Sequence, residues 1–406
     1  MELIGAEHEL YDVLRRPAQP QYEQVRPRAI ARCENAEDVA EALAYARTHD
    51  LPVVARGGGH CFAGRSSTTG LMLDLSPMSC VSVEGSVATI GAGARLAAVY
   101  RELHECGLTI PAGCGPTVGI AGLTLGGGLG LLGRRYGLTC DRLVAATVVL
   151  ADGNVVVCDE QRYADLFWAL RGAGGGQFGV VTALVFAAVP SPAATRFRIS
   201  WPRDRAAEVI DAWQHWAPDA ADDITASLTV TADRAEVFGA TLVPFDPGPF
   251  ADGAVEVRDD LSWPDLKRSL SEGEPDDRVL HSRSEFVRTA LPHATIAELL
   301  GTGCDLNFTP MGGAYNRVPP GATAFAHRDE RFLLEHVAPD RAAVRRSWST
   351  AHPHASGHTY PNFPDPDLTD WPTAYHGANY ERLLRIKQKY DPTNTFHFPQ
   401  SLGDTQ

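Results

Sequence analysis

Three glycine clusters in the first 190 residues could bind a large anionic group. They are Arg56-Gly57-Gly58-Gly59-His60, the stretch 111–137 and the run 171–176. Backbone N–H groups reach a pyrophosphate only where no side chain intervenes, and turns with positive φ aim successive amides at it. One such cluster is also what an ordinary tight turn looks like. Three together favour a phosphate cradle.

One of the clusters contains a dinucleotide-binding pattern. Gly128-Leu-Gly130-Leu-Leu-Gly133 matches G-x-G-x-x-G. A Rossmann domain needs a strand directly before this pattern and an acid about 20 residues later at the end of the next strand. Here residues 119–126 are themselves interrupted by glycine, and Asp152 is a turn residue before Gly153. The context therefore argues against a Rossmann nicotinamide site.

Metal chemistry finds little support in the pattern. His352, His354 and His358 have a spacing that can chelate, but they stand beside proline and glycine without a matching set of carboxylates or cysteines. The eight cysteines are scattered with no C-x-x-C pair, which excludes zinc-ribbon and thioredoxin patterns. We predict no metal site.

Composition excludes several classes of partner. The 406 residues hold 36 Lys and Arg against 50 Asp and Glu, a net charge of −14 with no long basic run. Nucleic acids and anionic membranes are therefore not expected partners, because both need clustered positive charge. The first residues carry acids where a signal peptide has basic residues, and no apolar run approaches about 18 residues. We expect a cytoplasmic protein, and the sequence leaves its oligomeric state unknown.

The glycine clusters alternate with predicted helices and strands. A helix over 35–49 with an Asn cap leads into a strand over 51–55, which ends at the first cluster. Strands over 145–150 and 180–189 flank the third cluster, with a helix over 163–170 between them. Composition changes at Pro190-Ser191-Pro192. Alternating strands over 225–230 and 236–243 and helices over 206–216, 341–350 and 379–389 follow. The pattern predicts an α+β protein with a glycine-rich half and a sheet-and-helix half.

Several motifs together resemble a known family. They are Arg56-Gly-Gly-Gly-His60-Cys-Phe-Ala-Gly64, Pro111-Ala-Gly-Cys-Gly-Pro-Thr-Val-Gly119 continuing to Gly130, Tyr136-Gly-Leu-Thr-Cys-Asp141, Gly174-Gly-Gly-Gln-Phe-Gly179 and the C-terminal Tyr375-His-Gly-Ala-Asn379. They are similar to FAD-linked oxidoreductases of the vanillyl-alcohol-oxidase type, with a PCMH-type FAD-binding domain, in the berberine-bridge-enzyme-like branch. The resemblance implies an FAD-binding domain at 1–190, an antiparallel-sheet substrate domain covered by helices at 191–365, and a C-terminal segment at 366–406 that returns to the FAD domain.

The resemblance also assigns cofactor contacts. It implies that FAD is bound by Arg56, Gly57, Gly58, Gly59, His60, Gly64, Gly113, Cys114, Pro116, Thr117, Val118, Gly119, Gly122, Gly126, Gly127, Gly128, Gly130, Gly179, Val181 and Asn379. By matching motif, His60 forms a covalent bond to the flavin 8α-methyl group. An electron-withdrawing imidazole there makes the flavin a stronger oxidant.

A second covalent bond, from a cysteine to flavin C6, occurs in many members of this family. The family's cysteine directly precedes Pro-Thr-Val-Gly, but here that position is Gly115, and Cys114 stands one residue earlier. A shift of one residue along an extended segment turns a side chain to the other face. We therefore expect one bond, through His60, with Cys114 as the unlikely alternative.

The resemblance further suggests where oxygen and substrate react. Val118 matches a position at which valine accompanies oxygen use, which favours an oxidase that passes electrons to O2 over a dehydrogenase. Several members use a tyrosine as the catalytic base, and Tyr360-Pro-Asn362-Phe363 resembles the family's Tyr-x-Asn-Tyr or Tyr-x-Asn-Phe strand. Because Phe363 cannot take a proton, Tyr360, Tyr375 and Tyr315 are the candidates. Tyr315 would lie on a strand at 312–317.

The predicted function is FAD-dependent oxidation of a small organic substrate: an alcohol, a sugar, an amine or a secondary metabolite. Two other readings stay open. The flavin could assist a non-redox cyclisation, or the chain could be a drug-binding resistance protein.

Overall fold

The computed structural model describes residues 1–271 and 279–404. Its N-terminal part begins with a four-stranded sheet in the order β1-β2-β4-β3. The strands are β1 (Glu2–Ile4), β2 (Ala29–Arg32), β3 (Val53–Arg56) and β4 (Leu71–Asp74), of which β2, β4 and β3 are parallel. Helix α2 (Ala36–Thr48) links β2 to β3, and the Asn35 side chain caps it by accepting the Asp38 N–H. Both the helix and its cap confirm the prediction.

A five-stranded antiparallel sheet packs against the first through one shared hydrophobic core. Its order is β5-β6-β10-β8-β9, with β5 (Val81–Glu84), β6 (Val87–Gly91), β8 (Leu143–Val149), β9 (Val155–Cys158) and β10 (Val180–Ala187). Helices α3 (Leu96–Glu105) and α6 (Ala164–Leu170) pack here, and β7 (Leu108–Thr109) pairs with β11 (Val189–Pro190). The shorter helices are α1 (Tyr11–Leu14), α4 (Ile120–Leu125) and α5 (Gly133–Tyr136).

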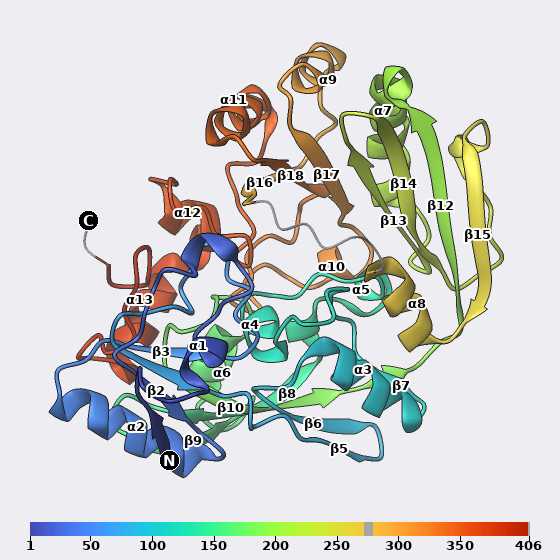
Figure 1. Cartoon of the computed structure of the whole chain (residues 1–406). Helices are drawn as coiled ribbons and strands as arrows, with labels where there is room; N and C mark the ends of the chain where they lie inside the picture. The colour runs from blue at the N-terminus through green and yellow to red at the C-terminus, as the bar shows by residue number, and fades with distance from the viewer. Residues whose placement is uncertain (272–278, 405–406) are drawn as a thin grey trace.

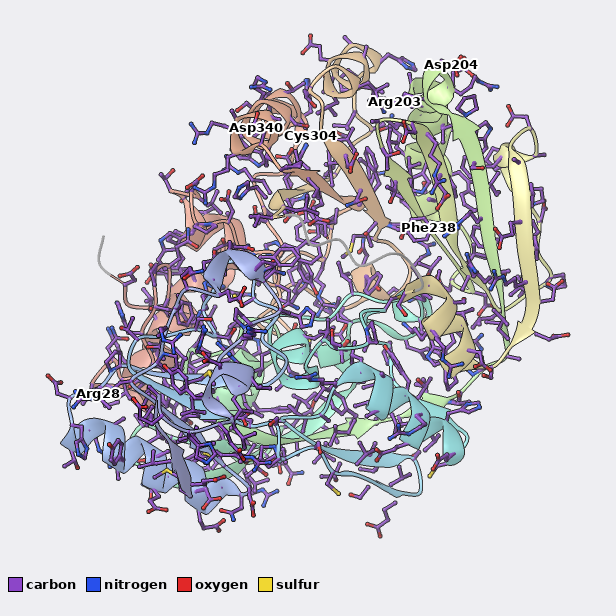
Figure 2. The ribbon with its side chains drawn as sticks, viewed as in Figure 1. Arg28, Arg203, Asp204, Phe238, Cys304 and Asp340 are labelled. Carbon is purple, nitrogen blue, oxygen red and sulfur yellow. The ribbon has the colours of Figure 1, made fainter. Side chains whose placement is uncertain are left out.

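The middle of the chain forms one seven-stranded antiparallel sheet, in the order β15-β12-β14-β13-β17-β18-β16. Its strands are β12 (Ala194–Pro202), β13 (Ile224–Val230), β14 (Arg234–Thr241), β15 (Ala254–Leu261), β16 (His281–Val287), β17 (Asp305–Pro310) and β18 (Phe332–Ala338). Helices α7 (Ala206–Trp216), α9 (His293–Leu300) and α11 (Arg341–Ala351) cover its outer face (Figure 1). Asp340, labelled in Figure 2, caps α11 by accepting the N–H groups of Ala342 and Ala343.

The other side of this sheet, its inner face, is turned toward the N-terminal sheets. Along β18, Phe332 and Leu334 pack under the helices, so Leu333 and Glu335 project to the opposite side. Leu333 packs there with Leu138 of the N-terminal part. The inner face is therefore the surface that meets the glycine-rich half.

The C-terminal segment returns to the N-terminal part (Figure 1). Helix α12 (Trp371–His376) precedes α13 (Tyr380–Tyr390), which packs on α6. The buried Lys387 ammonium donates to the Gln177 carbonyl at 2.8 Å and to Asp391 at 2.7 Å. None of the helices in the described part of the chain is long and apolar enough to cross a membrane.

Two segments differ from the predicted strands. Residues 314–317 form the short helix α10 (Ala314–Arg317), because Gly312 and Gly313 take positive φ and turn the chain after β17. Residues 360–363 lie in a turn, where the Phe363 N–H bonds the Tyr360 carbonyl. The mixed α+β organisation, with a large antiparallel sheet, is as predicted.

Candidate functional site

The first glycine cluster is a loop of unpaired amides at the end of β3. Among the described residues, no acceptor takes a hydrogen bond from the backbone N–H groups of residues 57–61. Gly58 lies against the second cluster so closely that a Cβ on it would stand 2.2 Å from the backbone nitrogen of Gly119. The two glycine loops are therefore adjacent, and glycine is required where they touch.

His60 joins the two loops. Its Nε2 lies 2.9 Å from the Thr117 hydroxyl oxygen. Burial, with a smaller contribution from the positive charge of Arg95, lowers the pKa of His60. The imidazole is therefore neutral near pH 7, the form with a lone pair available for bonding.

The loops fit a pyrophosphate group. Buried amides without acceptors are costly, and free N–H groups beside glycine are what a phosphate oxygen requires. Gly122 adds open backbone, because no described atom lies within 4 Å of a Cβ built on it. Gly175 of the third cluster lies next to Gly122, since a Cβ built on Gly175 would stand 4.0 Å from the Cα of Gly122. Parts of all three glycine clusters thus contribute to one accessible strip of backbone.

Cys114 contacts the helix α8 (Trp263–Ser271). The Lys267 ammonium lies 3.6 Å from the Cys114 sulfur, and donates to the carbonyls of Ala112 at 2.9 Å and Gly113 at 3.1 Å. Burial lowers the pKa of Lys267. Its three N–H bonds are all used, so this lysine anchors the second glycine loop and holds the thiol against α8.

We expect Lys267→Met to lower the free energy of unfolding by about 1–3 kcal/mol. The substitution leaves the Ala112 carbonyl without a donor, which costs about 1–3 kcal/mol before relaxation, whereas the Gly113 carbonyl still accepts the Tyr100 hydroxyl at 2.6 Å. Chemical denaturation of the flavin-loaded protein measures the change. The neighbouring Arg268, exposed on the same helix, gives the control, since Arg268→Met should change stability by less than about 0.5 kcal/mol. Equal effects of the two substitutions would disprove the anchoring role.

Aromatic side chains clamp the loop 126–130. The Tyr360 hydroxyl oxygen accepts the N–H groups of Gly128 at 3.0 Å and Leu129 at 3.1 Å. The Tyr315 hydroxyl accepts the Gly130 N–H at 3.0 Å and donates to the Gly130 carbonyl. A Cβ on Gly128 would stand 2.2 Å from the Thr139 hydroxyl, so the glycine here serves protein packing. Cofactor contact at Gly128 and Gly130 stays a prediction.

The three tyrosines are poorly suited to act as bases. Burial raises the pKa of Tyr360 and of Tyr375 to about 12, and also raises the pKa of Tyr315. The Tyr375 hydroxyl accepts the Asp365 N–H at 2.8 Å. All three phenols therefore stay protonated near pH 7 and act as hydrogen-bond partners in this structure, and the role of one of them as a base stays a prediction.

Three other expected site residues have structural surroundings. Val181 is buried in the core on β10, and a Cβ on Gly179 would stand 2.7 Å from Val148 of β8. The Asn379 amide donates to the backbone carbonyls of residues 320, 323 and 324. The side chains of Val181 and Asn379 are held by packing and hydrogen bonds within the protein, and cofactor contact at these three residues stays a prediction.

The three histidines whose spacing could chelate a metal, His352, His354 and His358, do not lie together in one cluster. His352 pairs with Glu285 at 3.1 Å, His354 is exposed, and His358 contacts Glu330 at 3.0 Å.

A carboxylate absent from the sequence-based candidates lies on the inner face of the large sheet. Glu335 of β18 accepts the Ser282 hydroxyl at 2.6 Å and the Asn307 amide at 3.3 Å. Burial raises its pKa, while the two hydrogen bonds oppose the shift. Glu335 stands two residues from Leu333, which packs with Tyr360 and Tyr315. A carboxyl group of raised pKa on this face is a candidate general base. The sequence feature that could have indicated Glu335 is a single acid that directly follows the apolar run Phe332-Leu-Leu334.

Comparison with known proteins identifies the family. Residues 27–159 match the model described as "FAD binding domain", and residues 359–403 match "Berberine and berberine like". An uncharacterized FAD-linked oxidoreductase of Bacillus subtilis, YgaK, is 35% identical, over 93% of this chain and 91% of its own. The chain belongs to the berberine-bridge-enzyme-like family of FAD-linked oxidoreductases.

Two more members of the berberine-bridge-enzyme-like family extend the comparison. Chitooligosaccharide oxidase of Gibberella zeae is 30% identical, over 93% of this chain and 87% of its own. The structure of Physcomitrella patens BBE-like 1 superposes with a TM-score of 0.92 at 26% identity, covering 99% of this chain and 96% of that one. FAD is therefore the cofactor, and the predicted family and fold are confirmed.

Proposed function

We propose that this protein is an oxidase that uses FAD to oxidise a small organic substrate and passes the electrons to O2. The single observation that supports substrate oxidation is Glu335, a half-buried carboxylate of raised pKa on the inner face of the large sheet. The identity of 30% to a chitooligosaccharide oxidase supports an alcohol or sugar substrate over an amine or other metabolite.

The free amides of residues 57–61 and the backbone at Gly119 and Gly122 would hold FAD. His60 would carry one covalent bond to it, because its neutral ring already contacts the second loop through Thr117. Cys114 lies against Lys267, which supports one bond rather than two. Bound FAD supplies a two-electron acceptor.

Glu335 removes the proton from the substrate hydroxyl or amine as hydride leaves the adjacent carbon. Two electrons and two protons thus leave the substrate, and O2 receives them as hydrogen peroxide. Ser282 and Asn307 hold the carboxylate through its two oxygens, which fixes its direction. A carboxylate of raised pKa is a stronger base than an exposed one.

The test is a peroxide balance in air. Chitooligosaccharides, simple sugars, benzylic alcohols and primary amines form the panel, and the proposal expects one H2O2 for each molecule of product. Product with an artificial dye as acceptor but without peroxide would make the protein a dehydrogenase. Product without reduction of either acceptor would indicate the non-redox cyclisation.

We expect Val118→Leu to slow reoxidation of the reduced enzyme by about tenfold, with flavin reduction by substrate little changed. Val118 is half-buried in the second glycine loop, and a Cβ built on Gly115 would stand 2.8 Å from the Cγ2 of Val118. One added methylene fills space that O2 needs, and tenfold corresponds to only about 1.4 kcal/mol of barrier. Stopped-flow mixing of reduced enzyme with air-saturated buffer measures it. Unchanged reoxidation in the variant would exclude Val118 as a gate.

A further inference from the structure

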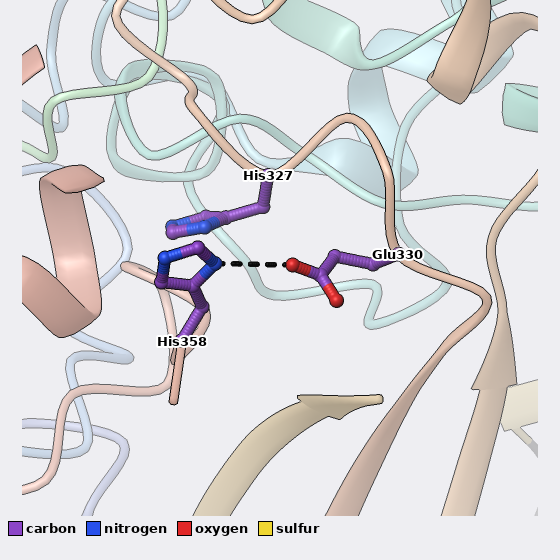
Figure 3. Close-up of side chains that lie close together, drawn as sticks. All are labelled: His327, Glu330 and His358. Carbon is purple, nitrogen blue, oxygen red and sulfur yellow. Dashed lines mark hydrogen bonds and ion pairs between the residues drawn. The ribbon is translucent and has the colours of Figure 1, made fainter. Parts of the chain in front are cut away.

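Three side chains that the proposed reaction does not use form a compact cluster next to β16, the edge strand of the large sheet (Figure 3). His327 and Glu330 come from the loop between α10 and β18, and His358 comes from the segment between α11 and α12. His327 and Glu330 are fully buried, and the side chain of His358 is 17% exposed. One possible ligand atom of each residue lies within 4.8 Å of the other two.

His327 presents an unused lone pair to this cluster. Its Nε2 lies 3.0 Å from the carbonyl oxygen of Tyr375, so Nε2 carries the hydrogen and Nδ1 carries the lone pair. Nδ1 is buried and has no hydrogen-bond partner among the described residues. A backbone carbonyl that fixes one ring nitrogen while the other stays free is the usual arrangement of a metal-binding histidine.

Glu330 also has one unused atom. Its Oε1 accepts from His358 Nδ1 at 3.0 Å and from the guanidinium of Arg288 at 3.0 Å. Its Oε2 is buried without a partner in the described part of the chain. A buried carboxylate oxygen left unpaired costs free energy that a bound cation would recover.

We propose that His327, Glu330 and His358 bind a divalent cation of the zinc class. Two imidazoles and one carboxylate are a known zinc donor set, with water in the fourth position. Ligands of one tetrahedral zinc are about 3.4 Å apart, as follows from bond lengths of about 2.0–2.2 Å. His358 Nδ1 and Glu330 Oε1 lie 3.0 Å apart, close to this spacing once Nδ1 gives up its hydrogen, and a shift of up to about 1.4 Å brings His327 into place.

Arg288 occupies the position of a competing cation. Its side chain is 45% exposed, so it can turn into solvent when the metal binds. The bound ion joins the loop before β18 to the segment that leads into α12, and His327 already holds the Tyr375 carbonyl of that helix. We therefore assign the site a structural role, and among the described residues none of its three side chains hydrogen-bonds to Glu335 or to the glycine loops.

Metal binding is tested on tag-free, flavin-loaded protein after removal of metals with a chelator. Calorimetric titration with ZnCl2 should show one equivalent, and zinc at 100 times its Kd should raise the melting temperature by about 3 °C. His327→Gln retains a donor for the Tyr375 carbonyl but lacks the ligand, and it should weaken zinc binding at least 30-fold. Glu330→Gln should do the same. His354→Gln, which changes an exposed histidine outside the cluster, should bind zinc like the unmodified protein.

Arg288→Gln separates this proposal from a simple ion-pair network. Removal of the competing charge should tighten zinc binding several-fold, whereas a cluster that only pairs Arg288 with Glu330 would gain no affinity. X-ray absorption at the zinc edge of the unmodified protein adds a test that does not depend on the folding of any variant. Two imidazole ligands and no sulfur are expected. Sulfur ligands, no stoichiometric zinc, or unchanged binding in His327→Gln would each overturn the proposal.

Discussion

Glu335→Gln should reduce substrate oxidation by roughly 10²–10⁴-fold, the usual contribution of a positioned general base. The amide keeps the shape of the side chain and can still accept a hydrogen bond from Ser282, but it cannot take a proton. FAD content and the melting temperature should stay near those of the unmodified protein. Anaerobic flavin reduction by substrate, followed by absorbance, measures the loss.

The pH profile distinguishes a base from a residue that only shapes the pocket. The carboxylate is the active form, and burial raises its pKa, so kcat/KM should fall as the pH decreases through that raised value. The Ser282 hydrogen bond lowers this pKa, and Ser282→Ala should therefore move the acidic limb to higher pH. Glu298→Gln, on the exposed surface of α9, should leave rate and profile unchanged. A Glu335→Gln enzyme within threefold of normal activity would exclude this role.

His60→Ala should abolish covalent attachment of the flavin. Acid precipitation of the unmodified protein is expected to leave nearly all of the flavin on the polypeptide, whereas the variant should release it as free FAD or be isolated without it. The physical reason is the neutral imidazole, which the structure places between the two glycine loops. Absorbance of the supernatant and mass of the His60 peptide give the result.

Cys114→Ser is the matched control for the attachment. Because the thiol lies against Lys267, its replacement should leave covalent flavin unchanged. Flavin found on both the His60 and the Cys114 peptides would show that the argument from the shifted position of Cys114 is wrong. If all of the flavin can be extracted from the unmodified protein, the proposed covalent attachment is wrong.

Local patterns predicted the parts of the fold that depend on neighbouring residues. Asn35 precedes an amphipathic run, and the structure has its cap and helix α2 in that place. The glycine motif at 56–60 follows a strand, as expected, because only glycine permits the contact of Gly58 with Gly119. These features depend on turn chemistry and side-chain size, which the sequence states directly.

The missed features depend on contacts between distant parts of the chain. The hydrogen-bond partners of Glu335 come from the neighbouring strands β16 and β17. Its role could therefore be predicted only with the register of three strands known. The sequence predicts Tyr360 as a possible base. In the structure its hydroxyl oxygen accepts the N–H groups of Gly128 and Leu129, which are 232 and 231 residues away in the chain, and burial raises its pKa. The sequence predicts a strand around Tyr315, but Gly312 and Gly313 take positive φ and turn the chain after the end of β17 at Pro310.

Anaerobic rapid mixing of the oxidised enzyme with the substrate panel tests the central claim most directly. At least one substrate should bleach the flavin absorbance in a single turnover, and admission of O2 should restore the absorbance with one equivalent of H2O2. The same substrate should bleach Glu335→Gln at least 100-fold more slowly. If a substrate is converted to product while the flavin remains oxidised, or if it bleaches the variant as fast as the unmodified enzyme, the proposed oxidation with Glu335 as base is contradicted.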